Sequence, residues 1–411
     1  NSLNPDTLQL SNHGTPLAYS LSLGRPNNAP VAVVQPQAPL PDGGPVTLTL
    51  TGGITDYEAN GLAPASATFT TGYGSDYASP QLVYSSPTSD ANQNVPAGAV
   101  FVFRFNEPID RTRWSGSLRN YNAAQWLPFT LQLSPDGTTV TLIPTGGLAA
   151  SSQYYACVTA YDLAGNGGGS YCSPSVYTAA APDPTLPQAV VTAPVANEVN
   201  VPTNALIEIL FNKVLAGNGI GQATLSANGN PVAQQTSLVN GGRVVRLTPA
   251  TLLAPNTVYT VTLSGFQDLG GDAMATPFSY QFTTGPNPDL SNATSFQTAS
   301  VTVGGVATQL STNSTLSGVD VGTVLTVTFS NPVLAPYLWT NGAVQLVNTN
   351  TSAVVPATLA LSSDGRTLTL TPQAPLAGAT GYTLQVNYYN PVYALAGYNV
   401  SGYGLFKFTT P

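Results

Sequence analysis

Short runs of alternating polar and apolar residues recur along the whole chain, and the clearest lies near its C-terminal end. An Asp364-Gly365 turn is followed by Thr367–Pro372, in which threonine alternates with leucine. Successive side chains of a β-strand point to opposite faces, so Leu368 and Leu370 are predicted to face a core. Similar runs are separated by Gly, Pro, Asn and Asp, and no stretch has a helical period. The pattern predicts an all-β protein.

This run is one of four copies. In each copy of the repeat the alternating run ends in a proline, with an aliphatic residue two positions before the proline and a leucine four positions after it. The prolines are Pro36, Pro144, Pro249 and Pro372, and the residues ten positions after them are Val46, Tyr154, Tyr259 and Tyr382. A threonine-containing block closes each copy, with its aromatic residue at Phe69, Tyr177, Phe282 and Phe408. These aromatic residues are 108, 105 and 126 residues apart, a spacing typical of one small domain.

The repeat divides the chain into four modules: module 1 (residues 1–75), module 2 (76–181), module 3 (182–286) and module 4 (287–411). Short alternating strands at this density predict a tandem array of Ig-like Greek-key β-sandwich domains. In such folds a tyrosine hydroxyl at the start of the sixth strand reaches back to the backbone. We expect this of Tyr154, Tyr259 and Tyr382.

Modules 1 and 4 depart from the pattern. In modules 2–4 a strand ends in a Phe-(Asn/Ser) phrase, at Phe105, Phe211 and Phe329, which lies 39, 38 and 43 residues before the proline. Counting back this far from Pro36 passes the first residue, so module 1 is expected to be incomplete at its N-terminus, without its first two strands. In module 4, the stretch 296–310 holds two runs joined by two glycines, and we expect an extra N-terminal hairpin there.

Several phrases of modules 2 and 3 together resemble the bacterial immunoglobulin-like repeat family. They are Val95-Pro96, Phe105-Asn106-Glu107-Pro108, Asp136-Gly137 and Asp162-Leu163-Ala164-Gly165-Asn166, and again Val201-Pro202, Phe211-Asn212 and Phe282-Thr283-Thr284. The resemblance covers nearly the whole chain. It implies tandem modules of secreted or surface-displayed bacterial proteins, such as surface-layer proteins and large adhesins, without shared catalytic residues. One departure is Asn390, which we align with the aspartate of the Asp-x-x-Gly-Asn phrase in module 4.

Composition narrows the possible partners. Charged residues make up 7% of the chain, the net charge is −8, and Lys213 and Lys407 are the only lysines. Nucleic acids and anionic membranes are bound through basic patches, and no such patch is present in the sequence. No run of about 18 apolar residues exists, so no membrane span is expected.

The two cysteines, Cys157 and Cys172, are expected to lie on neighbouring strands of module 2. A disulfide between them would close a loop of about 15 residues and contribute roughly 3 kcal/mol of stability. Two free buried thiols, or a metal site, are the alternatives. A disulfide would place the protein in an oxidising, extracytoplasmic compartment, and we expect an extracellular location on a bacterial cell surface.

Few residues are suited to catalysis. The only histidine, His13, stands beside Asn12 and Gly14, which predicts an exposed turn. The four glutamates lie in different repeat contexts, so a carboxylate pair for glycoside hydrolysis is not expected. We expect no enzyme activity and no cofactor.

The sequence also offers candidate calcium ligands. Three aspartates recur in equivalent loops: Asp56, Asp162 and Asp268. Aspartate in such loops commonly holds a turn by accepting hydrogen bonds from backbone amides, and it is also a calcium ligand. Both interpretations remain open from the sequence.

Candidate contact residues gather in module 4. Aromatic side chains among neutral polar residues suit a protein interface or a sugar-binding face, and they also fill cores. We consider as interface candidates four tyrosines and three residues of the predicted hairpin: Tyr389, Tyr393, Tyr398, Tyr403, Phe296, Val301 and Val303.

The sequence therefore favours a structural protein whose partners are copies of itself. Edge strands are normally protected by charged residues, which are scarce here, so neighbouring copies are expected to cover the edges. The open module 1 and the hairpin of module 4 suggest strand complementation between copies. The alternative is an adhesin fragment that binds a glycan or host protein.

Overall fold

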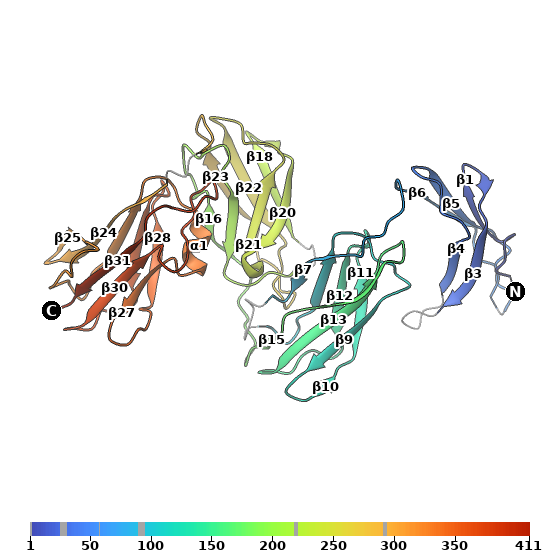
Figure 1. The fold of residues 1–411 in the computed structure, drawn as a ribbon, viewed down its shortest axis with the longest axis horizontal. Helices are drawn as coiled ribbons and strands as arrows, with labels where there is room; N and C mark the ends of the chain where they lie inside the picture. Colours follow the sequence, from blue (N-terminus) through green and yellow to red (C-terminus); the bar gives the residue numbers. More distant parts are fainter. Residues whose placement is uncertain (1, 25–30, 57, 89–94, 218–220, 291–293) are drawn as a thin grey trace. The chain divides into compact units, whose positions relative to one another are not determined.

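The computed structural model describes residues 2–24, 31–56, 58–88, 95–217, 221–290 and 294–411. Regular structure in these residues is almost entirely β, with one short α-helix, α1 (Ala335–Thr340) (Figure 1). The chain divides into two compact units. Residues 1–85, 101–145 and 155–173 form the first unit, and residues 86–100, 146–154 and 174–411 form the second. The prediction of an all-β, Ig-like architecture is confirmed.

Module 1 has one full sheet and one partial sheet. Its strands in the described residues are β1 (Leu8–Asn12), β2 (Thr15–Pro16), β3 (Tyr19–Gly24), β4 (Val31–Pro36), β5 (Pro45–Leu50) and β6 (Ala65–Thr70). The sheet β2-β1-β5-β6 is accompanied by the pair β3-β4, which has no further strand beside β4 among the described residues. The expectation that module 1 lacks its first two strands stays a prediction. Phe69 on β6 is 47% exposed, whereas Val46, its partner on β5, is fully buried.

Module 2 contains β7 (Leu82–Ser86), β8 (Phe101–Phe105), β9 (Ser115–Asn120), β10 (Gln125–Trp126), β11 (Phe129–Leu133), β12 (Thr139–Pro144), β13 (Gln153–Tyr161), β14 (Gly167–Cys172) and β15 (Val176–Tyr177). One sheet has the order β11-β12-β8-β7; in the other, β10-β9-β13-β14, β15 pairs with β13. Cys157 lies opposite Cys172 in the β13–β14 ladder, and the predicted disulfide joins them.

The closing block of module 2 is shifted from the sequence alignment. Val176, not Tyr177, pairs with Tyr154, and Val176 is fully buried. In modules 3 and 4, Phe282 and Phe408 have the equivalent pairings, with Tyr259 and Tyr382 respectively. The alignment of Tyr177 with these phenylalanines was therefore wrong by one residue, because adjacent residues of a strand face opposite sides.

Module 3 is the most regular sandwich. It consists of β16 (Ala189–Ala193), β17 (Ile207–Phe211), β18 (Gln222–Ala227), β19 (Asn230–Pro231), β20 (Gln234–Val239), a 3-10 turn (Asn240–Gly242), β21 (Val244–Pro249), β22 (Val258–Ser264) and β23 (Phe278–Thr283). The two sheets, β16-β17-β21-β20 and β19-β18-β22-β23, have the Greek-key order of an Ig-like fold. Buried residues from both sheets, such as Ile209 and Val261, form its core.

Module 4 repeats this plan with one added strand. It contains β24 (Phe296–Val303), β25 (Val306–Gln309), β26 (Leu325–Phe329), α1, β27 (Val344–Asn348), β28 (Ala357–Leu361), β29 (Thr367–Pro372), β30 (Gly381–Val386) and β31 (Gly404–Thr409). The sheets have the orders β25-β24-β26-β29-β28 and β27-β30-β31. The predicted hairpin is β24–β25. Because β24 also pairs with β26, as β16 does with β17, only β25 is an addition to the sandwich.

The expected tyrosine corner is present in modules 2, 3 and 4. The hydroxyls of Tyr154, Tyr259 and Tyr382 each accept a hydrogen bond from the backbone N–H five residues upstream, at 2.8, 2.7 and 2.9 Å. The same local bond in three modules shows that the alignment on the prolines placed these tyrosines correctly.

Modules 3 and 4 share a hydrophobic core within the second unit. Leu334 and Leu395 of module 4 belong to the core cluster of module 3. The N–H of Leu206 donates to the carbonyl of Leu395 at 2.9 Å, and α1 packs against β16 and β17. The sequence predicted no helix. The helix begins with a proline in its first turn, a favourable place for proline, and Leu338 on α1 is buried.

Candidate functional site

The recurring aspartates hold turns. Oδ1 of Asp162 accepts a hydrogen bond from the backbone N–H of Asn166, and Oδ2 accepts one from its side-chain amide, both at 2.8 Å. Asp56 makes the same two bonds to Asn60 at 2.9 Å, and Asp268 accepts from two N–H groups of its own loop. These are the bonds that the turn interpretation predicts.

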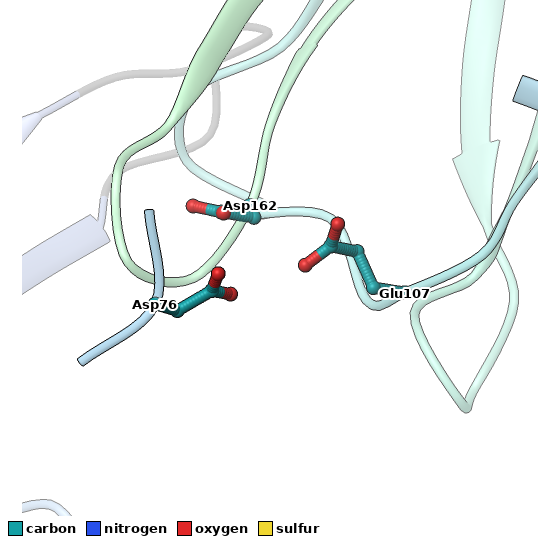
Figure 2. A group of neighbouring side chains, drawn as sticks. All are labelled: Asp76, Glu107 and Asp162. Carbon is teal, nitrogen blue, oxygen red and sulfur yellow. The ribbon is translucent and has the colours of Figure 1, made fainter. Parts of the chain in front are cut away.

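In module 2, two further carboxylates approach Asp162, and we call Asp76, Glu107 and Asp162 the carboxylate cluster (Figure 2). One oxygen of each lies within 4.8 Å of the others. Asp76 precedes β7, Glu107 follows β8, and Asp162 lies just after β13. Asp162 is almost fully buried, Glu107 is half-buried and Asp76 is exposed. Sequence analysis identified only Asp162; the phrase Phe105-Asn106-Glu107-Pro108 held Glu107 but gave no sign of this proximity.

The carboxylate cluster is electrostatically unfavourable without a cation. Burial raises the pKa of Glu107, and the charges of Asp76 and Asp162 and a hydrogen bond with Asp76 raise it further. Burial also raises the pKa of Tyr171, with contributions from Glu107 and Asp162. In the part of the chain that the structure describes, no lysine or arginine nitrogen lies within 4.0 Å of these carboxylates. Converging carboxylate oxygens are the ligands that calcium prefers.

The predicted contact tyrosines fall into two groups. Tyr389 and Tyr403 are 70% and 68% exposed, and the ring of Tyr388 lies between them, with centroid distances of 4.8 and 5.5 Å. We call Tyr388, Tyr389 and Tyr403 the tyrosine patch. Tyr398 is partly exposed. Tyr393 instead packs on Tyr337 at 5.0 Å, and both pack against the core of module 3. Tyr393 therefore contributes to a contact inside this chain.

The three hairpin candidates lie in or against the core of module 4. Val301 is 1% exposed, and Phe296 and Val303 pack against the same core cluster. Phe296 contacts the rings of Phe329 and Phe406, at 6.5 and 5.4 Å. The choice of these residues as interface candidates is corrected accordingly. These side chains face inward because β24 is a strand of the sheet itself, paired with β26.

His13 lies in the exposed turn between β1 and β2, with φ of 47°. Left-handed backbone conformations of this kind are typical of tight turns, and the sequence predicted such a turn here. No helix among the described residues has the length and apolarity needed to span a bilayer.

Comparison with solved structures gives matches to tandem Ig-like and related modules. One is the N-terminal part of the bacterial S-layer protein SbsC, with 12% identity, 46% of this chain, 42% of that chain and a TM-score of 0.20. Another is titin domains A168–A170, at 12% identity, where the match covers 80% of this chain and 97% of that chain with a TM-score of 0.19. A third is the FN1–FN3 domains of chicken CNTN1, at 13% identity, where the match covers 77% of this chain and 96% of that chain with a TM-score of 0.18. No curated protein matches the chain.

The family comparison is specific. The model of the bacterial Ig-like domain matches residues 76–177, 183–284 and 301–410. Together these matches cover most of the chain, and they contain the tyrosine corners, the shared closing strands and the two-sheet order described above. The protein thus belongs to the bacterial Ig-like domain family.

Proposed function

We propose that this chain is an extracellular structural protein that associates with copies of itself into a surface layer or filament of a bacterial cell. Tandem bacterial Ig-like domains and a disulfide are consistent with a secreted or surface-displayed protein. The proposal involves no catalytic step and no nucleic acid or membrane partner.

The observation that carries the proposal is the composition of the sheet edges. The edge strands of the described sheets include β6, β7, β11, β14, β16, β20, β23, β25, β27 and β28, and none of these contains Asp, Glu, Lys or Arg. Lys407 on β31 is the exception. Unpaired strand edges promote association, and proteins that remain separate usually protect such edges with charged residues. Uncharged edges on every module therefore favour contacts between like chains.

Module 1 offers a second kind of contact. Strand β4 pairs only with β3 among the described strands, whereas its counterpart β21 lies between β17 and β20. A strand from a neighbouring chain, added antiparallel to β4, would complete this ladder, with main-chain hydrogen bonds providing the affinity. It would also cover apolar surface such as that of Phe69, which is exposed here and buried at the equivalent positions of modules 3 and 4.

Association can be tested by placing lysine on an edge and on a matched central strand. Thr358 on the edge strand β28 lies opposite Thr371 on the central strand β29, and both are exposed. We expect wild-type protein to form oligomers in sedimentation velocity and a lattice or filament in electron microscopy. Thr358→Lys should weaken this association, and Thr371→Lys should leave it nearly unchanged. A wild-type chain that stays monomeric at high concentration, without lattice or fibre, contradicts the proposal.

The tyrosine patch favours a second candidate function, adhesion to a glycan or a host protein. Exposed tyrosines combine a large apolar surface with a hydroxyl, a combination common at binding surfaces. Tyr389→Ala and Tyr403→Ala should then reduce binding on a glycan array or to host cells, with Tyr398→Ala as the comparison. An array without hits, and adhesion unchanged in both variants, would remove this candidate.

A further inference from the structure

Module 3 contains a counterpart of the carboxylate cluster. The N–H of Gln81 donates to Oδ1 of Asn106 at 2.7 Å in module 2, and the N–H of Gln188 donates to Oδ1 of Asn212 at 2.8 Å in module 3. These bonds align the two modules. Five residues before the glutamines stand Asp76 and Asp183, and directly after the asparagines stand Glu107 and Lys213.

The third position of the correspondence is set by backbone pairing. Ile109 forms an antiparallel bridge with Asp162, and Leu215 forms the same bridge with Asp268. The local turns agree as well, because Oδ1 of the first aspartate accepts from the N–H two residues later in both modules, at 2.9 and 3.0 Å. The set Asp76, Glu107, Asp162 therefore corresponds to Asp183, Lys213, Asp268.

In module 3 this set holds its own cation. The ammonium of Lys213 lies 2.7 Å from Oδ2 of Asp268 and 3.4 Å from Oδ2 of Asp183. It also donates to the backbone carbonyls of Thr185 and Asp183, at 2.6 and 3.4 Å. A positive charge thus ties the chain that leads into module 3 to the Asp268 loop, through four oxygen atoms.

Module 2 keeps both aspartates but replaces the ammonium with a third carboxylate. Asp162 is as deeply buried as Asp268, so neither carboxylate is exposed enough for water to screen its charge fully.

Module 4 has different residues at these positions. The bridge of Val333 places Ala394 at the aspartate position, which corrects the sequence alignment of Asn390, and Asn331 follows the Phe329-Ser330 phrase. Module 4 thus carries no charge at these two positions. Among the described residues of modules 2, 3 and 4, module 2 alone places several carboxylates at these positions without a lysine or arginine beside them.

We propose that Asp76, Glu107 and Asp162 bind a calcium ion, which occupies in module 2 the place that the Lys213 ammonium fills in module 3. Three carboxylates that come from separate loops form a flexible set of oxygen ligands, of the kind that suits calcium better than magnesium. The ion would fasten the chain that leads into module 2 to the loops after β8 and β13. Its affinity should fall in the range of extracellular calcium modules, with a Kd of about 0.1–1 mM. This proposal is independent of whether copies of the chain associate.

The test exploits the difference between the two modules. Glu107→Lys converts the module 2 set into that of module 3 and should make the site independent of calcium. Glu107→Gln removes one ligand without adding a cation. Glu58→Lys, at an exposed position of module 1, makes the same change in net charge away from the carboxylate cluster. All four full-length proteins are compared in calcium chloride, and in magnesium chloride and sodium chloride at matched ionic strength.

The first readout is hydrogen exchange of peptides that contain residues 76–80, 105–110 and 162–166. At calcium about tenfold above the Kd, exchange in wild type and Glu58→Lys should slow by about tenfold. Glu107→Lys should show slow exchange without calcium and no further response, and Glu107→Gln should show fast exchange with a weakened response. The second readout is direct binding by calorimetry, which should give one site in wild type and none in Glu107→Lys.

Two outcomes overturn the proposal. One is a wild-type protein whose exchange and calorimetry do not change with calcium up to about 10 mM, well above the affinities of extracellular modules. The other is an equal calcium response in wild type and both Glu107 variants, which would assign calcium to a different place on the chain. If Glu107→Lys fails to fold, Glu107→Gln against Glu58→Lys still decides between these results.

Discussion

Removing the ionisable group of Glu198 is expected to stabilise the second unit at neutral and alkaline pH. Glu198 lies in the loop between β16 and β17 and is 1% exposed. Its Oε2 accepts a hydrogen bond from the N–H of Val195 at 2.8 Å, whereas its buried Oε1 has no hydrogen-bond partner among the described residues. Oε1 points at the Gly365 turn of module 4, where a β-carbon would lie only 3.2 Å away. A charge on this carboxyl would therefore be poorly solvated.

The size of the effect follows from the pKa of Glu198, which is raised from 4.5 to about 7. Burial is the main cause and the charge of Asp364 adds to it, while the Val195 N–H and Arg366 act in the opposite direction. Because the folded-state pKa is raised, the contribution of Glu198 to stability is complete below about pH 4.5 and is lost as pH rises through about 7. The loss by pH 8.5 corresponds to about 3 kcal/mol in the free energy of unfolding.

Glu198→Gln keeps an oxygen that can accept from the Val195 N–H and cannot ionise. The free energy of unfolding of wild type and variant should be similar at pH 5, and the variant should gain about 3 kcal/mol over wild type by pH 8.5. Urea titrations at a series of pH values, read by hydrogen exchange in peptides of modules 3 and 4, give this difference.

Glu58→Gln provides the matched control, because it removes one negative charge at an exposed position. The pH dependence of the Glu198→Gln difference is then read against that of Glu58→Gln. If the difference between Glu198→Gln and wild type is constant from pH 5 to 8.5, Glu198 titrates as an ordinary carboxyl and the reasoning is refuted.

Three further substitutions test the other interactions that hold the modules. Arg246 contacts Oε1 of the fully buried Glu208 at 2.5 and 2.7 Å, and Arg246→Met leaves this carboxylate without its partner. Urea unfolding should show that the free energy of unfolding falls by about 3–5 kcal/mol, and adding Glu208→Leu should largely restore it. Replacing both Cys157 and Cys172 by serine opens a loop with a sequence separation of 15 and should lower the free energy of unfolding by about 3 kcal/mol. Hydrogen exchange should become faster in the first unit and stay unchanged in modules 3 and 4. Tyr259→Phe removes the acceptor of its tyrosine corner and should cost about 1 kcal/mol in the same unfolding assay, whereas an unchanged midpoint would mean that the corner is not stabilising.

Much of the fold could be predicted because it is encoded locally and repeated. The alternation before each proline identifies a strand, and the tyrosine ten residues later forms the same bond in modules 2, 3 and 4. Cys157 and Cys172 could be paired because a hairpin places residues near each other in sequence on neighbouring strands. The same spacing in four copies distinguishes this pattern from a chance run of residues.

Aligning the modules by residue type gave the wrong residue where a residue of another type occupies the equivalent structural position. Tyr177 is aromatic like Phe282, yet Val176 occupies the buried position, and Ala394 takes the aspartate position that Asn390 was assigned. Register in a sheet is set by which face is buried, and a difference of one residue reverses the face. Only the pairing of the backbones in the structure shows which residue occupies each position.

The sequence by itself determined the all-β class, the Ig-like repeat and the scarcity of charged residues, because each depends on local pattern or on composition; it favoured the disulfide, which the structure shows. The tertiary structure decided which distant groups meet. It brought Asp76 and Glu107 to Asp162, placed Tyr393 against module 3, and buried Glu198 beside Gly365. These contacts join residues from separate loops, and the energies that result depend on distance and burial, which sequence spacing does not specify.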